Sequence, residues 1–242
     1  MSFLERVDQT IRRSPVWRSL FRNPYPTDER SRAYAVMNNV FLHLHPVRVR
    51  QHAVKFAYTF CLGGLSFFLF LVLTVTGVYL MFFYIPSTTS AYTDILNIQA
   101  SVAFGAITRN VHRWGAHLMV FFVFLHMMRV FYHGAYKPPR EFNWVIGVLL
   151  LLMTIALSFT GYLLPWDQIS YWAITIGLNM ASYTPVINVP IQNLIFGGLE
   201  VGQNTLLRFY VLHIMVLPLV AAILLAVHFW RIRKDGGISG PL

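Results

Sequence analysis

Four histidines on two apolar segments stand out in this sequence as candidate metal ligands. His112 and His126 lie 14 residues apart in one segment. His213 and His228 lie 15 residues apart in the other. An α-helix turns about 100° per residue and rises about 1.5 Å, so each segment directs two imidazoles to one side at levels roughly 21 Å apart. Imidazoles facing each other at two levels are typical of two bis-histidine haems near opposite surfaces of a membrane whose apolar core is about 30 Å thick.

A structural role is the alternative for each histidine taken alone. A histidine in an apolar helix is usually a packing residue with a hydrogen-bond partner. Unpaired polar groups are costly in hydrocarbon, so four at matching depths favour a shared purpose. His117 is a useful comparison, because it follows His112 by five residues and points about 140° away from it.

Two other apolar segments carry glycine pairs, each with a step of 14 residues: Gly63 with Gly77, and Gly147 with Gly161. Glycine allows close approach to the backbone, which could admit the edges of two porphyrins at the histidine levels. The ordinary explanation is close packing of one helix on another. Equal steps in three segments favour the cofactor.

Arginines flank three of the histidines, each at an offset of three residues toward a segment end: Arg109, Arg129 and Arg231. That offset places a guanidinium one turn further out on the same helix face, where haem propionates would reach water. Alternatively, these side chains merely extend toward water at the helix ends.

The composition of the 242-residue chain indicates a membrane protein. It is 56% hydrophobic and 12% charged, with a mean hydropathy of +0.55. Its single cysteine, Cys61, excludes an internal disulfide framework and is either an inert buried thiol or a chemically special one. Four stretches are long and apolar enough to span a membrane as helices: 56–93, 108–132, 142–166 and 209–230.

The positive charges predict the orientation of these spans. Of 19 Lys and Arg residues, 16 lie in residues 1–55, near the connection between the second and third spans, or after the fourth. By the positive-inside rule both termini are cytoplasmic. This distribution explains the net charge of +10 without a nucleic-acid partner.

Residues 1–55 are expected to form a basic cytoplasmic segment, and residues 56–242 the haem-binding membrane domain. The first segment has no apolar region typical of a signal peptide. Arginines alternate with apolar residues along 3–21, which predicts an amphipathic helix on the membrane surface, with Ser14-Pro15 as a plausible helix start. Residues 23–50 are expected to be irregular.

Several motifs resemble the cytochrome b of Rieske–cytochrome b quinol oxidoreductases. They extend over roughly residues 56–242 and are RNVHRW, FLHMMRVF, KPPREFNWVIGV, GYLLPWDQISYW, LLRFYVLH and GISGPL. The chain is most similar to the short, split form found in chloroplast bf complexes and Gram-positive menaquinol complexes. That resemblance implies an all-α fold: a bundle of four transmembrane helices holding haems, here with an N-terminal amphipathic surface helix.

The resemblance also implies the cofactor sites. His112 and His213 would hold one haem b near the positive side, and His126 and His228 another near the negative side. Cys61 matches a cysteine that binds a third haem through one thioether bond. Further haem contacts are implied at seven positions: Gly63, Gly77, Arg109, Arg129, Gly147, Gly161 and Arg208.

The implied activity is bifurcated oxidation of a membrane quinol, with one electron crossing the bilayer through the two b haems and protons being translocated. The wall of the quinol pocket would include Tyr162, Asp167, Ile169, Tyr171 and Ala173. Short surface helices with a purely structural role are the alternative for this region. The family's Pro-Glu-Trp-Tyr segment is absent from the sequence, so a subunit IV-like companion is expected to supply it and the chain is expected to be inactive alone.

Further partners implied by resemblance are a Rieske iron–sulfur protein, a c-type cytochrome, membrane lipid and a second copy of the complex. A bacterial cell membrane is favoured over a thylakoid. Two other functions compete with this one. The first is a dihaem b-type membrane anchor of another respiratory dehydrogenase, which would have no reason to carry PWDQISYW or GISGPL. The second is a transporter or scaffold without a cofactor, which would be colourless.

Overall fold

The computed structural model describes residues 3–14, 28–37, 51, 55–183, 194–195, 197 and 200–238. Helices dominate this part of the chain. In order they are α1 (Phe3–Arg13), α3 (Glu29–Met37), α5 (Phe56–Thr59), α6 (Leu62–Met81), α7 (Ala91–Ala100), α8 (Gly105–Tyr132), α9 (Glu141–Leu163), α10 (Gln168–Ser182), α12 (Gln203–Val211), η2 (Leu212–Val216) and α13 (Leu217–Asp235).

Four helices are long and apolar enough to cross a membrane. They are α6, α8, α9 and the continuous run of α12, η2 and α13, with 20, 28, 23 and 33 residues. Large apolar side chains cover their outer surfaces; Phe68 and Val75 on α6, for example, are 60% and 70% exposed. Such surfaces are stable against lipid rather than water, so the all-α membrane bundle predicted from the sequence is confirmed.

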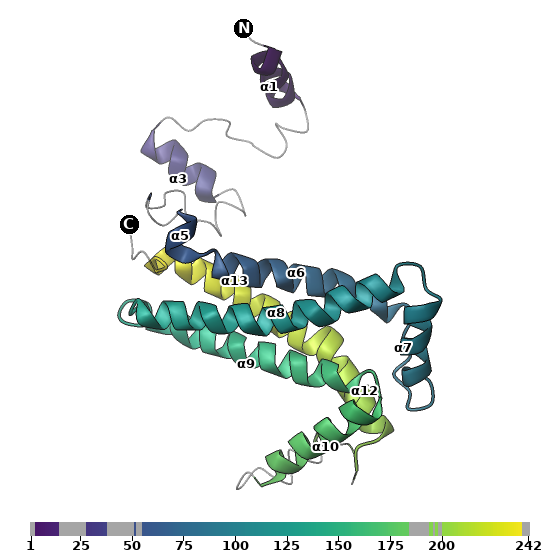
Figure 1. The fold of residues 1–242 in the computed structure, drawn as a ribbon. Coiled ribbons are helices and arrows are strands. Elements are labelled where there is room, and N and C mark those ends of the chain that lie inside the picture. Colours follow the sequence, from purple (N-terminus) through teal and green to yellow (C-terminus); the bar gives the residue numbers. More distant parts are fainter. Residues whose placement is uncertain are drawn as a thin grey trace.

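The four spans alternate in direction (Figure 1). Helices α6 and α9 run one way, and α8 and α13 run the other way. Backbone packing is closest between α6 and α8 and between α9 and α13. We call the two ends of the bundle the α5 end, where the chain enters α6 and leaves α13, and the α7 end, where α7, α10 and α12 lie.

A compact apolar core closes the α7 end. Ile98 of α7, Leu163 of α9 and Phe209 of α12 are almost completely buried in it. Tyr84 donates a hydrogen bond of 2.6 Å to the carbonyl of Leu164. Burial raises the pKa of Tyr84, so its hydroxyl stays protonated and keeps donating. This end therefore forms a packed apolar base at which α7, α9 and α12 meet.

Local backbone geometry shortens the first predicted span. The stretch 56–93 is free of charge, but only Leu62–Met81 forms the spanning helix. Phe60 and Cys61 both have φ of 51°, a left-handed conformation that separates α5 from α6. Beyond Met81 the chain turns and begins the separate helix α7.

The prediction that 23–50 is irregular is wrong for part of that segment. Residues Glu29–Met37 form α3, and Asp28 caps it by accepting a hydrogen bond of 2.8 Å from the Ser31 amide. An aspartate before a run of good helix formers is a helix start, so this helix was detectable. The amphipathic helix predicted near the N-terminus is present as α1, which ends at Arg13 rather than starting at Ser14. A helix after Pro15 would lie outside the described residues.

Candidate haem-binding sites

The structure brings the four histidines together as two pairs in the interior of the bundle. At the α7 end the ring centres of His112 and His213 are 6.2 Å apart. At the α5 end those of His126 and His228 are 6.4 Å apart. The pairing is the one that the family resemblance implies. His117 is exposed and lies against Trp114 instead, as its angular offset predicts.

The two separations match a metal ion held between each pair. A histidine nitrogen lies about 2 Å from the ion that it ligates and about 1 Å from the centre of its own ring, so two opposed imidazoles place their ring centres about 6 Å apart. Direct hydrogen bonding or stacking of the rings would bring them closer. The donor set of two imidazoles also suits a haem iron. The residues present therefore fit a bis-histidine haem at both levels.

A π-helical turn explains how a 15-residue step matches a 14-residue step. His213 lies in η2, where the Leu217 amide donates to the carbonyl of Leu212, five residues earlier. A π turn contains one residue more than an α turn. The extra residue is absorbed there, so His213 and His228 keep nearly the same phase as His112 and His126. Pro218 follows immediately and has no amide hydrogen with which to resume the α pattern.

Each of the four predicted glycines lies against one imidazole ring. A Cβ atom on Gly161 would lie 2.5 Å from Cε1 of His213. The corresponding distances are 3.1 Å for Gly63 with His126, 3.2 Å for Gly77 with His112, and 3.9 Å for Gly147 with His228. The glycines thus occupy the same two levels as the histidines, as the sequence predicts. Each glycine lies next to a histidine ring. The absence of a side chain allows the ring to lie close to the backbone of the helix that contains the glycine.

Hydrogen bonds fix the tautomer of the pair at the α7 end. His213 Nδ1 lies 3.0 Å from the carbonyl oxygen of Leu157, which can only accept, so Nδ1 carries the proton. His112 Nδ1 lies 2.8 Å from the hydroxyl of Thr76, whose own hydrogen is donated to the carbonyl of Val72. Both rings therefore leave Nε2 with its lone pair free, which is the form that ligates a metal.

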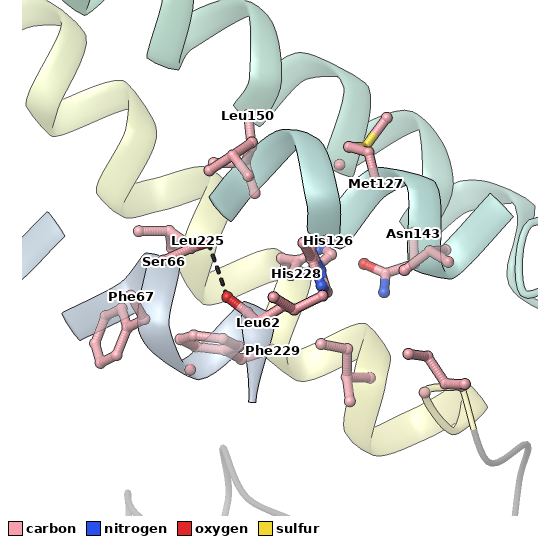
Figure 2. Close-up of a pocket in the computed structure, with 18 of the residues that line it drawn as sticks. Leu62, Ser66, Phe67, His126, Met127, Asn143, Leu150, Leu225, His228 and Phe229 are labelled. Carbon is pink, nitrogen blue, oxygen red and sulfur yellow. Dashed lines mark hydrogen bonds between the residues drawn. The ribbon is translucent and has the colours of Figure 1, made fainter. Parts of the chain in front are cut away.

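A cavity of about 490 Å³ contains the histidine pair at the α5 end. Figure 2 shows the His126 and His228 rings close together among the lining residues. The cavity also reaches Cys61, which is exposed, so the alternative of an inert buried thiol does not apply. Its volume is in the range of small-molecule and cofactor sites.

The cationic side chains that line this cavity differ from those singled out in the sequence. Arg129 instead donates to the carbonyl of Tyr58 and lies 5.2 Å from the centre of the Phe60 ring. Arg140 and Arg233 line the cavity. The sequence pattern missed both, because the approach of Arg140 depends on the fold of the α8–α9 connection and on its bond to the Gly237 carbonyl.

The other predicted arginines have protein partners or lie at the α7 end. Arg231 forms an ion pair of 2.5 Å with Asp235. Arg208 donates to the carbonyl of Leu194 and lies near Gly197. Arg109 is half-buried on the first turns of α8. Along their helices, Arg109, Arg129 and Arg231 each lie on the outward side of the neighbouring histidine, and Arg109 does so at the α7 end.

Residues of the predicted quinol pocket lie at the start of α10 and the end of α9. Asp167 caps α10 by accepting a hydrogen bond of 2.8 Å from the Ser170 amide, so it has a structural role there. Tyr171 is half-buried, and its ring contacts that of Trp166. Three further side chains are exposed: Tyr162, Ile169 and Ala173. In the part of this region that the structure describes, Gln168–Ser182 is one helix, and residues 194 and 195 are helical as well.

A comparison with known families decides the assignment. The family model described as cytochrome b/b6/petB matches residues 48–236. The chain belongs to the cytochrome b/b6 family. Both histidine pairs and all four spans of this cytochrome b/b6 chain lie inside the matched region, which makes it an integral membrane protein.

Two similar proteins cover most of this cytochrome b/b6 chain. A protein named cytochrome b6 from Heliomicrobium gestii is 49% identical over 183 residues, which is 76% of this chain and 85% of that protein. A protein from Bacillus subtilis (strain 168), named menaquinol:cytochrome c reductase cytochrome b subunit, is 39% identical over 237 residues, 98% of this chain and 96% of that protein.

A solved structure has the same fold. It is titled hyperthermophilic respiratory Complex III and matches with a TM-score of 0.71 and 25% sequence identity. The match covers 99% of this cytochrome b/b6 chain and 56% of that chain, so the present sequence corresponds to about half of the longer protein.

Proposed function

We propose that this chain is the cytochrome b subunit of a quinol:cytochrome c, or similar acceptor, oxidoreductase, with two haem b groups that carry electrons across the membrane. The observation that carries this proposal is the pair of imidazole couples, 6.2 and 6.4 Å between ring centres, at opposite ends of a four-helix membrane bundle of this family. The name of the B. subtilis relative supports quinol oxidation, and the proposal includes quinone reduction on the opposite side and the resulting proton translocation.

The chain's own residues would hold the cofactors in place. His112 with His213 would ligate the haem at the α7 end, and His126 with His228 the one at the α5 end. Haem, when bound, supplies one-electron redox chemistry. With two imidazoles held for each iron, the sites would suit electron transfer rather than binding of oxygen or substrate. In the sequence, most Lys and Arg residues precede α6, lie between α8 and α9 or follow α13, which supports a cytoplasmic location for the α5 end and for both termini.

The quinol site is proposed at the α7 end, with Tyr162, Asp167, Ile169, Tyr171 and Ala173 in its wall. Ile169 is 72% exposed in the single chain, so α10 has an apolar face that a companion could cover. The B. subtilis relative is named as the cytochrome b subunit of a menaquinol:cytochrome c reductase, which supports a multi-subunit assembly and a c-type cytochrome as a partner. A companion like subunit IV and a Rieske iron–sulfur protein belong to the proposal through the family resemblance. We extend the proposal to a homodimer of this complex in a bacterial cell membrane.

Cys61 is proposed to attach a third haem covalently through a thioether bond. Its support is the cavity that extends from His126 and His228 to Cys61 without interruption. The left-handed backbone at Cys61 places the sulfur atom next to Gly64, where a Cβ would lie 2.6 Å from Sγ. A glycine at that position leaves room for the sulfur beside the cavity.

The N-terminal segment 1–55 is proposed to lie on the cytoplasmic membrane surface, attached to the membrane domain 56–242. In α1 the apolar residues fall within one arc of about 100°: Phe3, Leu4, Val7 and Ile11. Phe3 and Leu4 are 79% and 76% exposed, which favours insertion of that face into the headgroup region.

Removal of single ligands tests the haem assignment. In the purified complex, His126→Ala or His228→Ala is expected to abolish the haem at the α5 end and to leave the other. The readout is the reduced-minus-oxidised absorption spectrum per mole of protein, with His117→Ala as the matched control on α8. If both ligand variants kept two full b haems, or if the wild-type complex were colourless, the proposed function would be rejected.

The covalent haem requires a separate test. Denaturing electrophoresis followed by staining for haem peroxidase activity retains only haem that is bonded to the chain. We expect the wild-type band to stain and the Cys61→Ser band not to stain, while both b haems remain in the spectrum of that variant. Equal staining of the two bands would show that the attachment is elsewhere.

A further inference from the structure

The two histidine pairs differ in what holds their outer ring nitrogens. At the α7 end, both Nδ1 atoms have partners on neighbouring helices: the Thr76 hydroxyl for His112, and the Leu157 carbonyl and Thr160 hydroxyl for His213. At the α5 end, Nδ1 of His228 is buried without a partner among the described residues. The two pairs therefore differ in the hydrogen bonding of their imidazoles.

The same five-residue pattern supplies the partners on both helices. It reads LTVTG in α6 and LSFTG in α9, and ends at Gly77 and Gly161 respectively. In each pattern the glycine lies against a histidine ring and the preceding threonine lies next to its Nδ1. The glycines at the other level follow Leu62 and Ile146, which have no hydroxyl.

The two patterns share their hydrogen-bond geometry in detail. Thr76 Oγ1 donates to the carbonyl of Val72 at 2.7 Å and lies 3.2 Å from that of Leu73. Thr160 Oγ1 donates to the carbonyl of Ala156 at 2.8 Å and lies 3.2 Å from that of Leu157. Each threonine hydroxyl donates its hydrogen to a carbonyl of its own helix. Toward the imidazole, its oxygen can therefore only accept a hydrogen bond, which Nδ1–H donates.

We propose that Thr76 and Thr160 are positioning residues that hold the imidazoles at the α7 end and lower the reduction potential of the haem there. The inference rests on the proposed haem ligation. An Nδ1 hydrogen bond fixes the rotation of a ligating imidazole and makes its other nitrogen a stronger donor. A stronger donor stabilises oxidised iron more than reduced iron, so loss of the hydroxyl raises the potential.

The bond lengths predict unequal contributions. His112 lies 2.8 Å from Thr76, whereas His213 lies 3.3 Å from Thr160 and 3.0 Å from the Leu157 carbonyl. Thr76→Val therefore shifts the potential more than Thr160→Val, and the double variant shifts it most.

Redox titration of the purified complex tests this proposal. The potential of each b haem is read from its absorption band, and His126→Ala identifies the band of the α7 end. In Thr76→Val/Thr160→Val we expect the potential at the α7 end to rise by at least a tenfold change in the reduction equilibrium, or about 59 mV for one electron, with the other haem unchanged. The matched controls Thr74→Val and Ser158→Ala lie in the same two patterns and bond only to their own helices.

The outcomes separate this inference from the proposed function. An unchanged potential in the double variant, or equal shifts in the controls, overturns the positioning role while leaving the haem ligation intact. If the valine variants fail to retain the haem, Thr76→Ser/Thr160→Ser decides the matter. Retention at the wild-type potential supports the hydroxyl role, and loss there too overturns it. A wild-type complex without b haems would refute the proposed function itself.

Discussion

Gly161 has only a hydrogen atom as its side chain, and the His213 ring occupies the space where a larger side chain would lie. The predicted distance of an added Cβ from that ring, 2.5 Å, is shorter than any normal contact, and the ring cannot retreat without leaving its hydrogen bonds. Gly147 faces His228 with much more room, at 3.9 Å. The two glycines of α9, one at each histidine level, are thus under different steric constraints.

We expect Gly161→Ala to lose most of the haem at the α7 end, because the methyl group would displace the His213 ring. Gly147→Ala is expected to retain both haems and serves as the matched control, since its Cβ would make an ordinary contact. The measurement is haem content per protein from the pyridine haemochrome spectrum. Equal haem loss in both variants would contradict the steric argument.

Tyr84 gives a pH-dependent prediction outside the membrane spans. Burial, with smaller contributions from Tyr210 and Asp94, raises its pKa above the ordinary value of 10.0. A raised pKa means that the stabilisation is complete below pH 10 and declines as the pH rises above that value. We expect Tyr84→Phe to cost about 1 kcal/mol at neutral pH and to flatten the fall in melting temperature above about pH 10. An equally steep fall in the variant would exclude Tyr84 as its source.

In the fourth span the two histidines are 15 residues apart, one more than in α8, so a local change of helix geometry is needed to keep them in phase. Its π turn carries the additional residue between His213 and His228. Met215 within this turn is 57% exposed, so its side chain contributes little packing inside the chain. The turn is therefore a place where the length of the helix can change while the phase of its ligands is kept.

Deletion of Met215 is expected to convert the π turn to an α turn and to leave a 14-residue step with both haems retained. Deletion of Phe121 in α8 is the control, because that helix has no π turn and the loss of one residue rotates His126 by about 100° relative to His112. Haem content and the two b absorption bands report the result. The π-turn explanation would be wrong if the two deletions lost haem to the same extent.

The spans and histidine levels could be predicted because both follow from simple periodicities. Lipid requires long apolar helices, and an α-helix fixes the phase of residues 14 apart. The threonine pattern was also present in the sequence, as LTVTG and LSFTG, but its meaning depends on a histidine contributed by another helix. The cavity-lining Arg140 could not be predicted in this way, because a chain reversal and a contact with the Gly237 carbonyl bring it there.

Helix α7 and the left-handed residues before α6 show a second limit. The 56–93 stretch has no charge to mark where a membrane helix ends, so hydropathy alone does not divide it. The break at Phe60 and Cys61 depends on backbone conformations that are rare for residues other than glycine and cost about 1 kcal/mol or more each. Tertiary contacts of the surrounding segments must maintain them.

As a whole, the molecule has two chemically different ends. The α7 end is closed by a buried apolar core, whereas the α5 end contains the cavity with Cys61, Arg140 and Arg233. Most Lys and Arg residues outside the spans also lie toward the α5 end in sequence. This asymmetry predicts which end is cytoplasmic.

We expect the α7 end to face away from the cytoplasm. In a Cys61→Ser background, which has no other cysteine, single cysteines can be introduced at Gln99 in α7 and at Lys137 between α8 and α9, both exposed. A membrane-impermeant maleimide should label Gln99→Cys in intact cells and Lys137→Cys only after lysis. The reverse pattern would invert the proposed orientation.

The lack of side-chain atoms between each imidazole and the helix behind it has a kinetic consequence. A ring that lies closely against a glycine, as His213 does at Gly161, and that is also hydrogen-bonded through Nδ1 has few positions to which it can shift when the charge beside it changes. Environments that are already arranged for a new charge impose a small barrier of rearrangement. The bundle would thus allow rapid passage of electrons through its rigidity, using glycine, the residue best known for giving chains freedom.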